Sequence, residues 1–192
     1  MSGTAEVHPE ATLTPGKLEL IAAWLPRQTW YTGSDASDTE RVAAYRFVDP
    51  YGEVGIETIL VRSGGVVYQV PLTYRSEPLD GAEEFLVGEM EHSILGHRWC
   101  YDATGDPVYV DELLRVIREA DEQAELSTGA PASIAVRGSG VVPVANSTSQ
   151  MKLFRVVDPA PESAKSRVAT GVLEGTWTLD GDERTTRLVA LY

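Results

Sequence analysis

Two runs of alternating, β-branched residues lie close together in the first half of the chain, and they restrict its fold more than any other feature. They span residues 54–62 and 66–74 and are separated only by residues 63–65, two of which are glycines. Two such runs around a short glycine-containing turn predict an antiparallel β-hairpin. Pro71 falls inside the second run, and proline lacks the N–H that a sheet uses, so we expect an edge position or a bulge there.

The sequence on either side of this hairpin predicts another strand and two helices. Residues 43–48 read as a strand that ends at an Asp-Pro-Tyr-Gly turn. Pro15 opens a short helix, and residues 107–124 form the strongest helical pattern, with Asp106 as its N-cap. Residues 82–96 fit a strand or a helix. We therefore predict an α+β fold in which a curved antiparallel sheet carries packed helices.

The second half of the chain has a different pattern. Residues 127–132 are small and polar and indicate a turn or linker. Beyond them the pattern predicts strands alone, at residues 133–136, 141–144, 151–157, 168–179 and 185–191. The predicted organisation is a mobile tail at residues 1–14, an α+β domain at 15–126 and a β-rich subdomain at 133–192.

An excess of acidic residues argues against two classes of partner. The chain has 16 Lys and Arg against 29 Asp and Glu, a net charge of −13. Nucleic-acid binding needs clustered basic residues, and an anionic membrane surface repels an acidic chain, so we expect neither partner. The N-terminus lacks the basic and apolar regions of a signal peptide, and Cys100 is the single cysteine. These features predict a cytoplasmic protein without a disulfide, and nothing in the sequence predicts a cofactor or a metal.

A compact group of polar and aromatic residues precedes the second predicted helix. It contains His92, Arg98, Trp99, Tyr101 and Asp102. Aromatic faces combined with a few polar groups suit a small-molecule site, here a sugar. A packed corner whose aromatic rings enter the core explains the same pattern. Nearby carboxylates could form an acid–base pair if their surroundings separate their pKa values, whereas the histidine spacing matches no zinc motif.

A second candidate group lies beyond the predicted linker. Gly138 and Gly140 belong to an Arg-Gly-Ser-Gly segment, and Lys152 follows on a predicted strand. A loop of small residues allows backbone N–H groups to approach a phosphate, and a strand lysine can pair with it. These three residues are therefore candidates for nucleotide binding, and an ordinary hairpin is the alternative.

Two segments resemble a known family. Residues 53–75 (EVGIETILVRSGGVVYQVPLTYR) and 89–110 (EMEHSILGHRWCYDATGDPVYV) resemble the N-terminal cap of actinobacterial maltokinases and related aminosugar kinases. The Lys-Leu-Phe-Arg sequence at residues 152–155 is similar to the strand-lysine context of the same kinases. The resemblance implies a cap-like α+β domain followed by a kinase-N-lobe-like half, in which the two glycines and the lysine named above are a remnant of a nucleotide site.

The chain also departs from these kinases. Only 40 residues follow Lys152, and neither the catalytic His-Gly-Asp loop nor a later Asp-centred metal motif occurs in the sequence. We therefore expect no kinase activity from this chain alone. The leading interpretation is a non-catalytic binding or regulatory protein of α-glucan, maltose or aminosugar metabolism. Its expected partner is a kinase or a glucan-metabolism enzyme, and its expected ligand is a sugar or a nucleotide.

Two other functions fit the sequence. One is a small carbohydrate- or sugar-phosphate-active enzyme that uses the carboxylates, histidine and aromatic residues between positions 89 and 109. The other is a self-associating structural module that forms a homodimer through exposed sheet edges.

Overall fold

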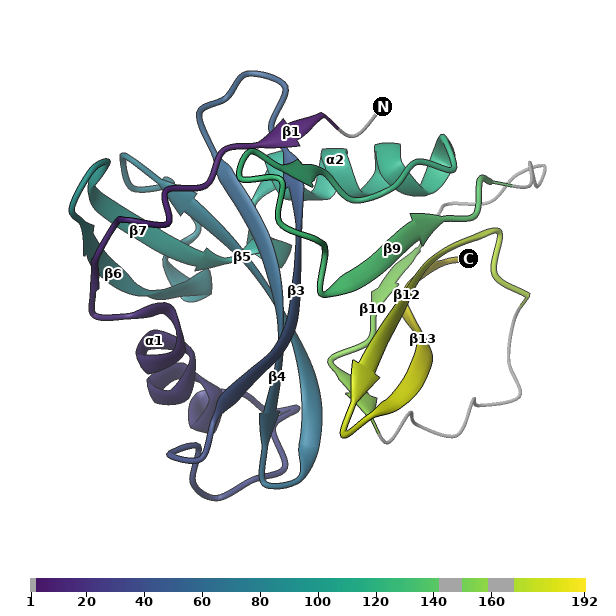
Figure 1. Cartoon of the computed structure of the whole chain (residues 1–192), viewed down its shortest axis with the longest axis horizontal. Helices are drawn as coiled ribbons and strands as arrows, with labels where there is room; N and C mark the ends of the chain where they lie inside the picture. Colours follow the sequence, from purple (N-terminus) through teal and green to yellow (C-terminus); the bar gives the residue numbers. More distant parts are fainter. Residues whose placement is uncertain (1–2, 142–149, 159–167) are drawn as a thin grey trace.

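A computed structural model describes residues 3–141, 150–158 and 168–192. Figure 1 shows a strongly curled antiparallel sheet with a smaller sheet beside it. The large sheet has seven strands, in the order β2-β6-β7-β5-β4-β3, and β11 pairs with β5. The strands are β2 (Leu13–Thr14), β3 (Glu40–Val48), β4 (Gly55–Ser63), β5 (Val66–Arg75), β6 (Leu86–His92), β7 (Gly96–Asp102) and β11 (Val156–Asp158).

The smaller sheet has four strands in the order β10-β13-β12-β9, and β1 pairs with β8 in a separate two-stranded unit. These strands are β1 (Thr4–Ala5), β8 (Glu125–Leu126), β9 (Ile134–Gly138), β10 (Met151–Leu153), β12 (Gly171–Leu179) and β13 (Asp182–Leu191). In the strand predicted at residues 141–144, positions 142–144 lie outside the described residues.

The predicted hairpin is confirmed by β4 and β5, in which Ser63 pairs with Val66 across the turn. Only Gly64 and Gly65 connect the strands, with φ of 59° and 77°. Positive φ at both central positions characterises a type I′ turn, whose twist matches that of the paired strands. Glycine adopts such angles without a steric penalty, so this local sequence sets the register of the hairpin.

The prediction of an edge or bulge at Pro71 is wrong, because β5 lies inside the sheet. One side of β5 pairs with β4, while the other side meets β11 at residues 67–68 and β7 at residues 72–75. The Gln69 N–H donates to the Arg155 carbonyl on that second side, and backbone direction repeats every two residues. The nitrogen of Pro71 therefore faces the gap between β11 and β7, where the sheet requires no hydrogen-bond donor from β5.

The α+β prediction is confirmed only in part. The curled antiparallel sheet is present, but the described residues contain just two short α-helices, α1 (Lys17–Trp24) and α2 (Pro107–Arg118), so the fold is mainly β. Short 3₁₀ turns also occur at η1 (Leu25–Arg27), η2 (Glu83–Phe85) and η3 (Ala103–Gly105). The ambiguous segment at residues 82–96 forms η2 and β6, the strand alternative.

Helix α2 begins where the sequence predicts and ends earlier. Asp106 Oδ1 accepts the Val108 N–H at 3.0 Å, the side-chain bond of an N-cap. Past the last helical residue, Ala120 has φ of 54°. This left-handed conformation ends the helix, and the chain then continues toward β8.

Two hydrophobic clusters cover opposite faces of the large sheet. One packs α1, through Ile21 and Trp24, against Ile59 and Tyr68. The other packs α2 and the smaller sheet against the opposite face, and it includes Leu60, Leu113, Leu173 and Leu188. Successive side chains of a strand point to opposite faces, so a single sheet supplies both clusters. The second cluster joins residues from both sides of the predicted linker at 127–132.

The N-terminal segment crosses the concave side of the large sheet (Figure 1). β1 pairs with β8, and β2 pairs with β6. The Val7 N–H donates to Ser127 Oγ at 2.9 Å, and the Thr12 N–H donates to Ser93 Oγ at 3.0 Å. Residues 3–14, for which the sequence predicts a mobile tail, are thus hydrogen-bonded at both ends.

Candidate functional site

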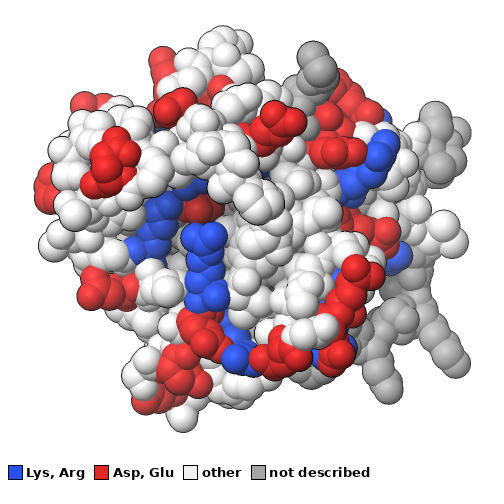
Figure 2. Space-filling view, viewed as in Figure 1, with Lys and Arg blue, Asp and Glu red and all other residues white. Residues whose placement is uncertain are grey.

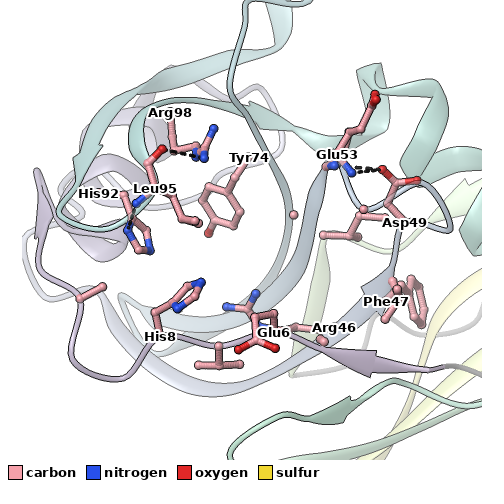
Figure 3. Close-up of a pocket in the computed structure, with 18 of the residues that line it drawn as sticks. Glu6, His8, Arg46, Phe47, Asp49, Glu53, Tyr74, His92, Leu95 and Arg98 are labelled. Carbon is pink, nitrogen blue, oxygen red and sulfur yellow. Dashed lines mark hydrogen bonds between the residues drawn. The ribbon is translucent and has the colours of Figure 1, made fainter.

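A pocket of about 480 Å³ lies between the N-terminal segment and the large sheet (Figure 3). Strands β3, β4 and β5 form its floor, the β6–β7 hairpin and the start of α1 form its walls, and residues 4–13 cover it. Small-molecule sites in proteins typically have volumes of about 300–1,000 Å³, so this pocket is large enough for a small ligand.

Strand alternation brings four polar side chains to the pocket side of the sheet. Arg46 on β3 pairs with Glu57 on β4, and the β4–β5 register places Tyr74 on the same face as Glu57. Tyr74 in turn pairs with Cys100 on β7. Arg98 is two residues before Cys100 and therefore shares this face.

Glu57 lies beneath the pocket floor and binds three residues that line it. Its carboxylate accepts hydrogen bonds from Lys17 Nζ at 2.5 Å and Tyr74 Oη at 3.0 Å, and Arg46 Nη2 lies 3.1 Å from Oε1. Burial raises the pKa of Glu57, but Arg46 and Lys17 more than compensate and hold that pKa at about 2. Glu57 is therefore an ionised anchor that fixes the positions of two cations and a phenol.

His92, at the end of β6, presents a hydrogen-bond donor to the pocket. Its Nδ1 accepts the N–H groups of Ile94 and Leu95 at 3.2 and 3.1 Å, so the neutral ring carries its proton on Nε2. The ring of His8, from the covering segment, is 5.7 Å away in an edge-to-face arrangement. Partial burial lowers the pKa of His92, and the nearby His8 and Arg98 lower it further.

The two ends of the pocket differ in charge. Figure 3 shows His8, His92 and Arg98 around one end and Asp49 at the other. Arg98 donates to the Leu95 carbonyl at 2.7 Å, a bond that holds its guanidinium at the pocket wall. The Asp49 carboxylate instead accepts N–H groups of its own loop, from Tyr51, Glu53 and Val54. Asp49 is thus occupied in shaping the β3–β4 turn.

The candidate cluster from the sequence is divided among different surroundings. His92 and Arg98 line the pocket, whereas Trp99 points to the opposite face of β7, where its ring contacts that of His97 at 4.3 Å. Tyr101 is buried, and its hydroxyl accepts the Leu79 N–H at 2.9 Å.

Asp102 is buried and forms an ion pair with Arg155. Its Oδ1 also accepts the hydroxyl of Thr104 at 2.9 Å, and the Arg155 guanidinium lies 4.8 Å from the ring centroid of Trp30. Asp102 therefore connects β7 to the segment that follows β10.

His92 and Asp102 are too far apart to act on one bond. His92 pairs with Gly96 at the start of β7, and Asp102 is the last residue of that strand. Six residues of β-strand span about 20 Å. The structure therefore does not bring the predicted cluster together as one catalytic centre.

The glycines proposed for phosphate binding have roles within the fold instead. The Gly138 N–H donates to the Asp121 carbonyl at 2.8 Å, and the Gly140 N–H donates to the Ile117 carbonyl at 2.9 Å. A Cβ on Gly138 would lie 2.2 Å from the Val116 carbonyl oxygen, so the absence of a side chain allows β9 to approach α2. Both amides already donate to backbone carbonyls of the fold, so neither is placed to bind a phosphate as the sequence analysis predicted.

Lys152 lies on β10, a strand at the edge of the smaller sheet, and its side chain is exposed. Its ammonium is 5.1 Å from the ring centroid of Phe154. The contact is a cation–π interaction at the surface, worth little in water.

Sequence reasoning missed the residues at the base of the pocket. Glu57 and Arg46 stand out in retrospect as charged residues inside strongly apolar strands. A buried charge requires a partner, so each of them signalled an ion pair. The identity of the partners could not be read from the sequence, because Lys17 is 40 positions from Glu57.

Neither a metal site nor a membrane helix is found in the part of the chain that the structure describes. Residues 3–141, 150–158 and 168–192 contain no group of three His, Cys, Asp or Glu side chains placed to hold a metal ion. Within the same residues, no helix has the length and apolar character to cross a membrane.

The structure is a mainly β fold with a pocket, in which a curled antiparallel sheet is covered on its concave side by the N-terminal segment. Residues 24–106 match the family model of the maltokinase N-terminal cap domain. The matched part runs from the end of α1 to the N-cap of α2, so this region is similar to a maltokinase N-terminal cap domain. No curated protein matches the chain.

Proposed function

We propose that this chain is a non-catalytic binding or regulatory module of α-glucan, maltose or aminosugar metabolism, built on its maltokinase N-terminal cap-like domain. The observation that carries the proposal is the state of the carboxylates around the candidate cluster. Glu57, Asp102 and Asp106 are all buried, and each is held in an ion pair.

Such carboxylates are poor proton donors. Arg75 binds Asp106 through two bonds of 2.7 Å, and Asp106 also caps α2. Burial raises the pKa of Asp106, but Arg75 and the other bonds to the carboxylate outweigh that effect and lower it overall. A general acid at neutral pH requires the opposite, a raised pKa in an apolar site. The ion pairs therefore support a binding role.

A protein partner is expected to contact the outer surface of the β6–β7 hairpin. Ile94 and Leu95 at its tip are 47% and 46% exposed, and Trp99 is half-buried on the outer face. Partly exposed tryptophan is enriched at the centre of protein interfaces. We propose a kinase or a glucan-metabolism enzyme as the partner.

The remaining parts of the chain fit this proposal as supporting structure. We interpret the four-stranded sheet of residues 133–192 as a kinase-N-lobe-like subdomain that packs against the cap-like region of residues 15–126. The Lys-Leu-Phe-Arg sequence on and after β10, together with the shared hydrophobic cluster, supports this interpretation.

The experiment compares partner capture by the intact chain and two aromatic variants. Tagged wild-type protein is purified from a lysate of its own source, and the proteins that copurify in stoichiometric amounts are identified by mass spectrometry. We expect a kinase or a glucan-metabolism enzyme, and we expect Trp99→Ala to lose it. Tyr51→Ala is the matched control, because Tyr51 is 86% exposed on the β3–β4 turn.

A second assay tests the absence of catalysis directly. The purified chain is incubated with magnesium, ATP and maltose, glucose or glucosamine, and ADP formation is followed. Sugar-dependent turnover by the wild-type chain would contradict the proposal, as would equal partner capture by Trp99→Ala and wild type.

A further inference from the structure

Part of the pocket beneath the N-terminal segment carries a local excess of positive charge within an acidic protein. Lys17 and Arg46 share one carboxylate, that of Glu57, which leaves one positive charge in excess. Arg98 adds another, and it forms no ion pair with a carboxylate within residues 3–141, 150–158 and 168–192. Figure 2 shows Lys and Arg atoms in the left half of this face, with Asp and Glu atoms beside them and over the rest of the face.

The acidic residues that line the pocket do not cancel this charge. The Asp49 carboxylate already accepts hydrogen bonds from three backbone N–H groups of its own loop, and Glu6 and Glu53 are exposed. Exposed carboxylates are screened by water and salt, whereas a partly enclosed cation acts at lower effective dielectric. The end of the pocket lined by His8, His92 and Arg98 therefore attracts an anion.

We propose that this pocket binds a small phosphomonoester, with the phosphate at the end lined by His8, His92 and Arg98. The inference rests on the proposed binding function and deepens it by naming a ligand class. Arginine presents a planar fork of donors that matches phosphate oxygens. Within the described residues Arg98 donates one hydrogen bond, to the Leu95 carbonyl. His92 adds its Nε2 proton, because Nδ1 is already an acceptor.

The apolar part of the pocket suits the rest of such a ligand. Leu13, Val48 and Met90 line it, and Met90 is buried. Pockets that combine an apolar lining with a few convergent polar groups are the usual form of small-molecule sites.

The site is largely built before a ligand arrives. The covering segment that carries His8 is held on one side by β1 and Ser127 and on the other by β2 and Ser93. Glu57 fixes Lys17 and Arg46 from below. A site whose donors are already positioned loses little entropy on binding, so phosphate recognition needs no folding step.

The test is a titration of the full chain followed by NMR of the histidine rings and by calorimetry. The probes are inorganic phosphate, glycerol 3-phosphate and glucose 6-phosphate, and glycerol and glucose are their neutral counterparts. We expect the phosphate probes to shift the resonances of His8 and His92 and the neutral probes to leave them unchanged. Arg98→Gln should weaken binding by about 10- to 100-fold, the value of a hydrogen bond to a charged group.

Arg137→Gln is the matched control. It removes the same charge from an exposed arginine on β9, outside the pocket, and is expected to leave affinity within about twofold of wild type. Equal losses in the two variants would show non-specific attraction and overturn the proposal, as would phosphate probes that leave both histidines unshifted. Equal binding of glucose and glucose 6-phosphate would overturn phosphate recognition while leaving the binding-module function intact, because partner capture is measured separately.

Discussion

Replacing Glu57 by glutamine removes the negative charge that holds Lys17 and Arg46 together while keeping the size of the side chain. Glu57 is 4% exposed, and its pKa in the folded protein is about 2, against an ordinary value of 4.5. That difference corresponds to about 3 kcal/mol of folding stability at neutral pH. We therefore expect Glu57→Gln to lose about this much, a large part of a typical domain's stability.

The direction in which folding shifts the pKa of Glu57 determines how the effect of Glu57→Gln changes with pH. Because folding lowers the pKa of Glu57, its contribution is fully present above the unfolded pKa of about 4.5 and is lost as the pH falls toward about 2. The difference in unfolding free energy between wild type and Glu57→Gln should therefore be largest at neutral pH. It should shrink by about half near pH 3.

The assay is urea unfolding followed by tryptophan fluorescence at several pH values. Glu40→Gln serves as the control, because Glu40 pairs with Arg62 at the surface and its side chain is 55% exposed. Exposed pairs contribute at most about 1 kcal/mol, so this variant should stay near wild type. A loss below about 1 kcal/mol for Glu57→Gln at neutral pH, or a loss that does not change between neutral pH and about pH 3, would refute the reasoning.

Three other predictions follow from the structure. Gln69→Leu should lower the unfolding free energy by about 3–5 kcal/mol, because the Gln69 side chain donates to two carbonyls of other segments and accepts the Tyr45 hydroxyl, buried bonds that leucine cannot make. Gly138→Ala should unfold the protein or shift its melting temperature strongly downward, because the new Cβ would lie 2.2 Å from the Val116 carbonyl oxygen. Hydrogen bonds to Glu91 and Glu89 raise the pKa of His97, so Glu91→Gln should lower that pKa in an NMR titration.

Each of these has a control and an outcome that would contradict it. Gln150→Leu changes an exposed glutamine, and a loss as large as that of Gln69→Leu would argue against the buried hydrogen bonds. Gly16→Ala meets no contact closer than 3.5 Å and should be tolerated, so equal effects at Gly16 and Gly138 would be inconsistent with a clash. For His97, a pKa unaffected by Glu91→Gln would exclude the pairing as its cause.

Local sequence was sufficient where one short segment contains all the interacting groups. The β4–β5 hairpin follows from two adjacent glycines with positive φ, and the start of α2 follows from the Asp106 N-cap with proline in the first turn. The resemblance to the maltokinase cap likewise rests on a contiguous stretch, and residues 24–106 confirm it.

The same reasoning failed where a partner lies elsewhere in the chain. Pro71 is tolerated inside β5 because two separate strands leave a gap beside it, and no local pattern shows that gap. His92 and Asp102 are close in sequence, yet an extended strand separates them by about 20 Å. The Gly138 and Gly140 amides are satisfied by carbonyls of Asp121 and Ile117, which the sequence did not associate with them.

The sequence by itself thus determined the β4–β5 hairpin, the first turn of α2 and the resemblance to the maltokinase cap, because each depends on a few consecutive residues or on one contiguous stretch. Tertiary structure alone decided the pocket. Lys17, Arg46, Glu57 and Tyr74 become neighbours only when the sheet curls and α1 packs on its concave face. Their charges are stabilised by mutual proximity in a buried setting, a property of distances across the fold that no single segment encodes.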